Sequence, residues 1–259
     1  MPAETIRVET RYDGQVTDIT IGPPPANIVT ALMIDELAAE LDRHATGQKD
    51  VKLVVIRGDG EHFSYGASVE EHRPEQIRDV LPKLHKLIGG MLENPVPTLA
   101  AVSGMCLGGG FELVMGCTLI FADEGAAFGV PEIKLGVFPP AASLLLPWLS
   151  SSASAARIIL GGSNVNAQTA HRLGVVTEMA APGELDAAID QFIEKDILRK
   201  SASSLRFANR ALRSGIAAHW AAHIGDIERL YINDLMATAD AVEGITSFLE
   251  KRKPVWKNE

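Results

Sequence analysis

Short apolar runs and alternating stretches fill the first half of the chain. Apolar and polar residues alternate over residues 6–12 and 16–21, on either side of the turn pair Asp13-Gly14, which predicts a β-hairpin. Further apolar runs have the length of buried strands, at residues 51–56, 98–102, 118–122 and 127–128. The pattern therefore predicts that strands dominate early in the chain.

Amphipathic stretches predict the helices. Two of them, residues 30–45 and 75–92, lie between the predicted strands, and from residue 141 the chain becomes mostly helical. The later elements that we expect are a helix at 167–173, a strand at 175–179 and helices at 183–200, 203–213, 218–238 and 241–251. The order of strand, strand and helix suggests an α/β protein with a repeating ββα unit rather than a doubly wound sheet.

A glycine triplet, Gly108 to Gly110, separates the apolar run 98–102 from an apolar helical turn. Glycines between a strand and a helix allow a close approach of the backbone, and the first amides of the helix are free to bind an anion. The triplet therefore predicts a site for an anion or a developing oxyanion. The alternative is that the glycines only let the helix pack tightly on the strand.

Two glutamates in apolar surroundings accompany this turn. Glu112 follows the triplet, and Glu132 lies in the turn Val130-Pro131-Glu132-Ile133. Paired carboxylates beside an oxyanion site are suited to proton transfer next to a carbonyl group. A turn-capping role for Glu132 and an ion pair for Glu112 are the structural alternatives.

Composition limits the classes of function. The 259 residues are 46% hydrophobic with a net charge of −9, so we expect a folded protein without nucleic-acid partners. Only two cysteines occur, the first residues lack the apolar core of a signal peptide, and no run approaches the length of a membrane span. We therefore expect a soluble, cytoplasmic protein with no membrane partner.

The sequence offers little support for a metal or a cofactor. His219 and His223 have a helical metal-site spacing, but the run His-Trp-Ala-Ala-His lacks the glutamate of an HExxH motif, so we expect a surface pair. No GxGxxG fingerprint follows a predicted strand, so a nicotinamide cofactor is not expected.

The segments GMCLGGGFEL and AFGVPEIKLGVFP resemble the central signature of the crotonase (enoyl-CoA hydratase/isomerase) superfamily. PPPANIVT, HFSYGASVEEH and FLEKRKPVW extend the resemblance over nearly the whole chain. The resemblance implies a spiral ββα core over residues 1–199 and a helical region over 200–259 that covers the site and trimerises. It also implies an acyl-CoA thioester substrate, no cofactor and no metal, and a homotrimer or a dimer of trimers.

The resemblance also implies roles for individual residues. The backbone N–H groups of Ala67 and Gly109 correspond to the oxyanion hole that holds the thioester oxygen. Glu112 corresponds to the base that activates water and Glu132 to the acid. The residues implied in binding the substrate or CoA are Ala26, Ser64, Tyr65, Gly66, Ser68, Gly108, Val137 and Lys253. Near Lys253, Lys251 and Arg252 are further candidates for the CoA phosphates, with a solvated basic helix end as the alternative.

The chain departs from the usual family pattern in two places. Ser68 stands where an acid is common, and the glycine-rich stretch after Glu132 is replaced by a bulkier one with Pro139 and Pro140. The combination of SYGASVEEH, GMCLGGGFEL and PEIKLGVFPPAASLLLP resembles a branch that adds water to cyclohexa-1,5-diene-1-carbonyl-CoA, a cyclic dienoyl thioester of anaerobic benzoyl-CoA degradation. The alternatives are a hydratase or isomerase of another acyl-CoA and a non-catalytic binding subunit.

Overall fold

The computed structural model describes residues 5–47 and 49–259. The strands are β1 Ile6–Arg11, β2 Val16–Ile21, β3 Leu53–Gly58, β4 Thr98–Val102, β5 Met105–Leu107, β6 Leu119–Asp123, β7 Ala127–Gly129, β8 Val165–Asn166 and β9 Glu178–Ala180. The α-helices are α1 Ala31–Thr46, α2 Pro74–Glu93, α3 Gly108–Met115, α4 Pro140–Leu149, α5 Ser152–Gly161, α6 Ala167–Arg172, α7 Leu185–Phe192, α8 Ala202–Arg229 and α9 Ala239–Leu249. Short 3₁₀ turns span η1 Glu70–His72, η2 Pro131–Leu135 and η5 Leu235–Ala237, and π-helical turns span η3 Ile193–Ile197 and η4 Leu230–Asp234.

The strands form two sheets. The larger has the order β1-β2-β3-β4-β6-β9, in which β1 and β2 form the expected antiparallel hairpin and the other pairs are parallel. The smaller has the order β5-β7-β8, and bridges from Val29 to Ala67 and from Ser64 to Cys106 extend this layer. The chain passes from a large-sheet strand to the second layer and then to a helix, first as β3, residues 64–67 and α2, and then as β4, β5 and α3. This order confirms the predicted ββα spiral.

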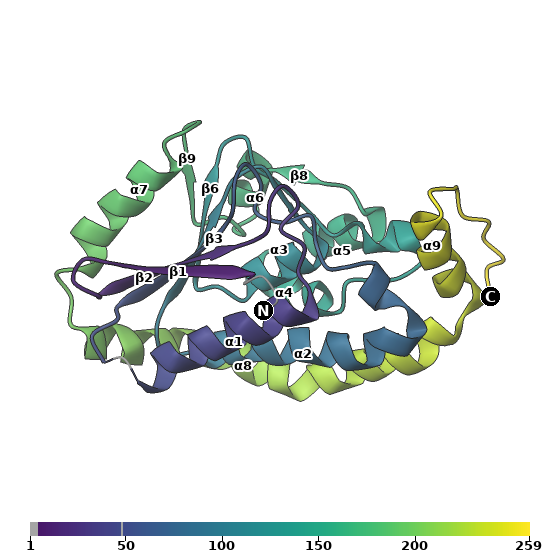
Figure 1. Ribbon diagram of the computed structural model, residues 1–259, viewed down its shortest axis with the longest axis horizontal. Coiled ribbons are helices and arrows are strands. Elements are labelled where there is room, and N and C mark those ends of the chain that lie inside the picture. Colours follow the sequence, from purple (N-terminus) through teal and green to yellow (C-terminus); the bar gives the residue numbers. More distant parts are fainter. Residues whose placement is uncertain (1–4, 48) are drawn as a thin grey trace.

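Helices cover both faces of the large sheet. Figure 1 shows α1, α2 and α8 side by side below the sheet, and α7 on the other side. Successive residues of β3 point to opposite faces of the sheet. Val54 and Ile56 lie in the main core, whereas Leu53 and Val55 pack with Ile189 of α7. The inner strands β3 and β4 are buried on both faces, which explains why they read as continuous apolar runs.

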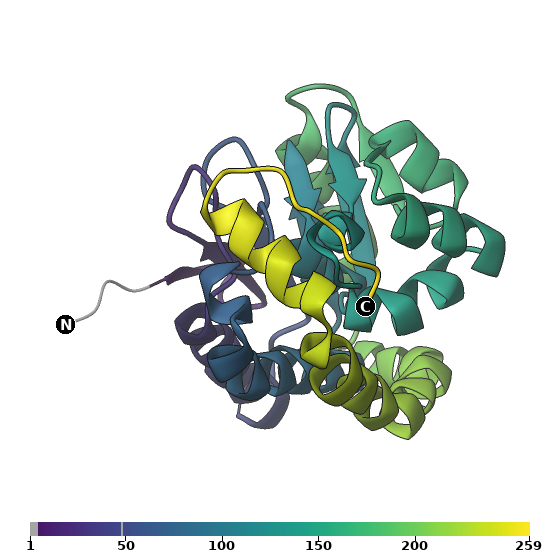
Figure 2. The ribbon, with the colours of Figure 1, turned by 90° about the vertical axis from the view of Figure 1, so that its right-hand side faces the viewer.

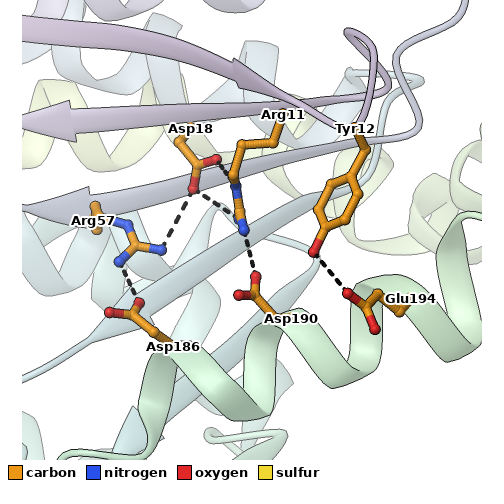
Figure 3. A network of polar contacts seen from close by, with 7 residues as sticks. All are labelled: Arg11, Tyr12, Asp18, Arg57, Asp186, Asp190 and Glu194. Atoms are coloured by element: carbon orange, nitrogen blue, oxygen red, sulfur yellow. Dashed lines mark hydrogen bonds and ion pairs between the residues drawn. The ribbon is translucent and has the colours of Figure 1, made fainter.

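Ion pairs attach α7 to the edge of the large sheet (Figure 3). Asp18 of β2 lies between two arginines, with Arg11 Nε at 2.5 Å and Arg57 Nη2 at 3.4 Å. The same two arginines reach Asp190 and Asp186 of α7. One shared carboxylate therefore aligns the hairpin, β3 and the helix.

The helical C-terminal region is confirmed, but its division into elements is not. The predicted helices 203–213 and 218–238 are one helix, α8, that continues into η4. A glycine inside a helix costs about 1 kcal/mol, yet Gly215 lies on α8 where a side chain would meet Trp148 of α4. The buried Arg213 donates hydrogen bonds to the carbonyl groups of Gly116 and Cys117 at 2.7 and 2.8 Å, so tertiary contacts keep the helix unbroken.

Other boundaries differ at turns. The strand predicted at 175–179 is wrong in position, because β9 begins only at Glu178. The N–H groups of Val175 and Val176 both bond to the carbonyl oxygen of Ala170 and so belong to the turn after α6. Gly174 has a φ of +86°, as expected of the residue that ends this helix. The strands β5 and β8 were not predicted, since elements of three and two residues show no periodicity.

The helix predicted at 183–200 begins at Leu185 and changes to the π turn η3 after Phe192. The main core includes Ile216 and Trp220 of α8 together with residues of the strands, so the C-terminal helices share the core of the first part of the chain. The division into two regions near residue 200 stays a prediction. Within the described part of the chain, no helix combines the length and apolar character that crossing a membrane requires.

Candidate active site

A cavity of about 850 Å³ opens beside α3. Its walls come from α2, the loop 65–72, the first turn of α3, η2, η4 and α9, and they are mostly apolar. Figure 2 shows α9 and the C-terminal segment lying across this side of the molecule. The cavity thus combines the glycine-rich turn and both glutamates with a wall from the helical C-terminal region.

Ala67 and Gly109 lie side by side at the wall of this cavity. An atom at the Cβ position of Gly109 would be 3.3 Å from the backbone nitrogen of Ala67. Val29 bonds to both neighbours of Ala67, donating to Gly66 O at 3.0 Å and accepting from Ser68 N at 3.2 Å. The N–H of Ala67 has no acceptor within residues 5–47 and 49–259, and that of Gly109 is in the first turn of α3, where amides lack intrahelical partners. Two N–H groups are therefore available at one place.

The local chain requires glycine next to each of these residues. Gly66 has a φ of +111° and Gly108 a φ of +49°, which L-residues with a side chain rarely adopt. A side chain on Gly66 would also lie 3.2 Å from Leu107 O, and one on Gly108 would lie 2.9 Å from Glu132 Oε1. These glycines let the loop, α3 and Glu132 meet.

Glu112 is a buried carboxylate with backbone donors. Its Oε1 accepts a hydrogen bond of 2.9 Å from Ala142 N in the first turn of α4. Burial raises the pKa of Glu112, whereas the N–H groups of Ala142 and Ala141 and the charge of His85 oppose that rise. Because the start of α4 is a positive helix end, it supports the ionised form of this carboxylate.

Glu132 lies in a different environment on η2. Its Oε2 is shielded from solvent and has no hydrogen-bond partner within the described part of the chain. Burial and then the neighbouring Glu112 raise the pKa of Glu132 well above its ordinary value. Desolvation disfavours a charge, and a second charge close to the first is disfavoured further. Of the two carboxyl groups, Glu132 is therefore the one that keeps a proton.

The structure places the other predicted residues in two groups. Most of them line the cavity, namely Tyr65, Gly66, Ser68, Gly108 and Val137. Ala26, Ser64 and Lys253 are not among the described lining residues. Ser64 Oγ accepts from Gly66 N at 3.0 Å and donates to Asn27 O at 2.8 Å, and Ala26 O accepts from Tyr65 N at 2.9 Å. Both thus hold the loop that carries Ala67.

The basic C-terminal residues differ from one another. Arg252 lines the cavity and forms an ion pair with Glu243, and it also bonds to the carbonyl oxygen of the exposed Lys253. Lys251 is exposed with a φ of +55°. A role of these residues in binding phosphates stays a prediction.

The histidines near the loop make backbone contacts. His62 Nδ1 accepts from Met105 N at 3.2 Å, and His72 Nδ1 lies 2.7 Å from Ser68 O. His219 and His223 have ring centroids 4.8 Å apart, and His219 stacks on Trp148. The contacts of His62 and His72 give these two residues a structural role beside the loop.

Some lining residues could not be found from the sequence. Phe138 and the fully buried Tyr231 pack edge-on, with ring centroids 5.3 Å apart, and both line the cavity. Tyr231 lies in a stretch that reads as an ordinary helix, so no local signal marks it. The donor Ala142 had one sequence signal, because Pro140 is suited to the first position of a helix and starts α4.

Comparison with known proteins gives a consistent result. A family model described as enoyl-CoA hydratase/isomerase matches residues 11–259. Cyclohexa-1,5-dienecarbonyl-CoA hydratase of Thauera aromatica is 42% identical over 253 residues, covering 98% of this chain and 97% of that protein. 2,3-dehydroadipyl-CoA hydratase of Escherichia coli (strain K12) is 31% identical, covering 92% of this chain and 94% of that protein. The crystal structure of an enoyl-CoA hydratase from Mycobacterium avium subsp. paratuberculosis K-10 has a TM-score of 0.87 at 25% identity, covering 99% of this chain and 100% of that chain.

The chain therefore belongs to the enoyl-CoA hydratase/isomerase (crotonase) family, as the motifs around the glycine triplet indicated. It is an enzyme of the hydro-lyase class. The fold predicted from that resemblance is confirmed.

Proposed function

We propose that this protein hydrates a cyclic conjugated dienoyl-CoA, converting cyclohexa-1,5-diene-1-carbonyl-CoA to 6-hydroxycyclohex-1-ene-1-carbonyl-CoA in anaerobic benzoyl-CoA degradation. The observation that carries the chemistry is the meeting of Glu112, Glu132 and the Ala67–Gly109 pair in one apolar cavity. The choice of the ring substrate is supported by the name of the Thauera aromatica relative. No cofactor enters the reaction, and CoA is part of the substrate.

In this proposal the N–H groups of Ala67 and Gly109 bind the thioester oxygen. Addition to the conjugated system pushes an electron pair onto that oxygen, and two preorganised donors stabilise the resulting enolate. Removal of one such donor typically costs about 3 kcal/mol. The positions of Gly66 and Gly108 support this role, because they bring the two amides together without a side chain between them.

The two glutamates divide the proton transfers. Glu112, with N–H donors at its carboxylate, takes a proton from water as the water oxygen bonds to the β carbon. The pKa of Glu132 is raised well above its ordinary value by burial and by Glu112, so this residue holds a proton. Glu132 gives that proton to the far carbon of the diene. The double bond moves to the carbons between, and one water is added in total. The proton on Glu132 is restored from Glu112 through solvent.

The bulky segment after Glu132 supports a reshaped acyl pocket. Pro140 starts α4, and Phe138 packs against Tyr231 at the cavity wall. A linear enoyl-CoA is the second candidate substrate, since the Escherichia coli relative is named for 2,3-dehydroadipyl-CoA. The non-catalytic binding subunit that the sequence left open does not fit the hydratase relatives or the intact pair of glutamates.

The first experiment is an anaerobic assay of the purified protein with the cyclic dienoyl-CoA and, in parallel, with crotonyl-CoA. We expect the mass of the ring substrate to increase by one water. If only crotonyl-CoA were hydrated, the proposal of a ring substrate would be rejected. If neither compound reacted, hydration of cyclic dienoyl-CoA and of linear enoyl-CoA substrates would both be rejected.

The matched variants are Glu132→Gln and Glu124→Gln. Glu132→Gln keeps the size of the side chain but removes the acid, so kcat should fall by about 10²–10⁴-fold while thioester binding remains. Glu124 is an exposed turn residue outside the cavity, and its variant should behave as wild type. Normal turnover by Glu132→Gln would exclude the two-carboxylate mechanism.

We further propose a homotrimer or a dimer of trimers in the cytoplasm. Large apolar side chains on the outer surface support self-association, among them Phe207 and Leu212 of α8, which are 67% and 74% exposed, and Leu160 of α5 at 72%. Sedimentation at micromolar concentration tests this, and a monomer would contradict it.

A further inference from the structure

Tyr231 places an unused hydroxyl group in the active-site cavity. The side chain is 1% exposed and lines the same cavity as Glu112 and Glu132. Its hydroxyl has no hydrogen bond to another residue within residues 5–47 and 49–259. A tyrosine hydroxyl at the wall of a cavity can donate a hydrogen bond to a molecule inside it.

The backbone around Tyr231 is also unusual. The residue lies in the π turn η4, which interrupts the regular helical geometry at the end of α8. Single π turns inside α-helices occur frequently at functional sites. The ring is fixed by Phe138 at 5.3 Å and by an apolar cluster with Ile77 and Leu81 of α2, so the hydroxyl has a defined position.

Glu132 needs a donor at one stage of the proposed reaction. Once it has given its proton away, it is a carboxylate in apolar surroundings, and its buried Oε2 has no hydrogen-bond partner among the residues that the structure describes. A charge-assisted hydrogen bond is the usual way to stabilise such a group. Burial first, and then the charges of Glu132 and Glu112, raise the pKa of Tyr231, so its hydroxyl remains a protonated donor.

We propose that Tyr231 is a positioning residue that donates a hydrogen bond, through a water molecule in the cavity, to the Glu132 carboxylate formed when the substrate is protonated. This inference rests on the proposed function and adds a residue to it. The phenol keeps its own proton throughout. Its effect is to lower the pKa of Glu132 from the value that burial alone would impose, which makes Glu132 a stronger acid.

Other ionisable groups near the pair must be considered. Within the described residues, the charge that acts on Glu132 is that of Glu112, and the charge that acts on Glu112 is that of His85 of α2. Burial lowers the pKa of His72, so this group is neutral in alkaline solution. The remaining ionisable residues of the cavity wall are Tyr65, Glu70, Glu71, Lys134 and Arg252.

The test is the variant Tyr231→Phe, which keeps the ring and its packing and removes only the hydroxyl. Activity requires protonated Glu132 and is lost as the pH rises through its pKa. Without the donor that pKa increases, so the alkaline limb of the kcat profile should move up by about one pH unit and kcat should fall about tenfold, with KM nearly unchanged. Tyr12→Phe is the matched control, since Tyr12 lies at the hairpin near α7, and it should match wild type.

Each outcome decides one point. An unchanged kcat and alkaline limb in Tyr231→Phe would overturn the inference, and loss of thioester binding with an unmoved limb would do the same by indicating a packing role. Normal turnover in Glu132→Gln would instead overturn the proposed function itself. If Tyr231→Phe does not fold, wild-type protein containing 3-fluorotyrosine gives the answer. Its stronger phenol donor should move the alkaline limb to lower pH, and no movement would refute the inference.

Discussion

Gly244 of α9 allows the C-terminal helix to approach the turn that carries Glu132. A Cβ atom at this position would lie 2.0 Å from Leu135 O and 3.1 Å from Gly136 N. Ordinary contacts of a Cβ begin at 3.4 Å, so α9 and η2 would have to separate by about 1.4 Å. Both nearest groups are backbone, and no side-chain rotation can relieve the overlap.

Gly244→Ala should therefore reduce both stability and activity. An overpacked contact of this kind costs about 1–3 kcal/mol of unfolding free energy. Glu132 is on the same turn as Leu135, and a displacement of about 1 Å at a catalytic group lowers the rate about hundredfold. Urea unfolding gives the first quantity, and kcat with the cyclic dienoyl-CoA gives the second.

Gly90→Ala is the matched control. Gly90 lies inside α2, and a Cβ there would meet no atom of residues 5–47 and 49–259 within 4 Å. This variant should gain about 0.4–1 kcal/mol of stability and keep full activity, because alanine favours the helix and restricts the unfolded chain. Wild-type stability and kcat in Gly244→Ala would contradict the inference that α9 and η2 are too close for a side chain at this position.

Two further predictions concern charges. Glu132 binds its proton more tightly in the folded protein than in the unfolded chain, so wild-type stability falls as the pH rises from the unfolded pKa through the raised folded pKa, by at most about 1.4 kcal/mol per pH unit. Glu132→Gln removes this dependence and should gain stability relative to wild type as the pH rises; a difference that is constant with pH would contradict it. Asp18→Asn leaves Arg11 and Arg57 without their shared carboxylate and should lower the unfolding free energy by about 2 kcal/mol without changing kcat, whereas Glu9→Gln in an exposed pair should change it by less than about 1 kcal/mol. Equal urea midpoints for both variants would refute the role given to the network.

The sequence was sufficient for much of the fold. Strands such as β4 are buried on both faces, and their apolar runs are visible without any tertiary information. The Asp13-Gly14 turn marked the hairpin because its geometry depends on two adjacent residues. Helix limits in the C-terminal region were less predictable, since Arg213 and Trp148 hold α8 together through partners distant in the chain.

The candidate site shows the same division. The glycine triplet, Glu112 and Glu132 could be selected from residue types and spacing, because an oxyanion site and a proton-transfer site need these groups. The different environments of Glu112 and Glu132 could not be predicted from the sequence. The donor to Glu112 comes from the start of α4, 30 residues further along the chain.

The sequence by itself determined the family, through motifs that resemble it, and the identity of the two carboxylates. The resemblance also implied the spiral order of strands and helices, which the strand and helix pattern only suggested. Only the tertiary structure decided which carboxyl group accepts a backbone hydrogen bond and which has a buried oxygen without a partner among the described residues, because pKa and burial depend on atoms that folding brings together from α3, η2, α4 and η4.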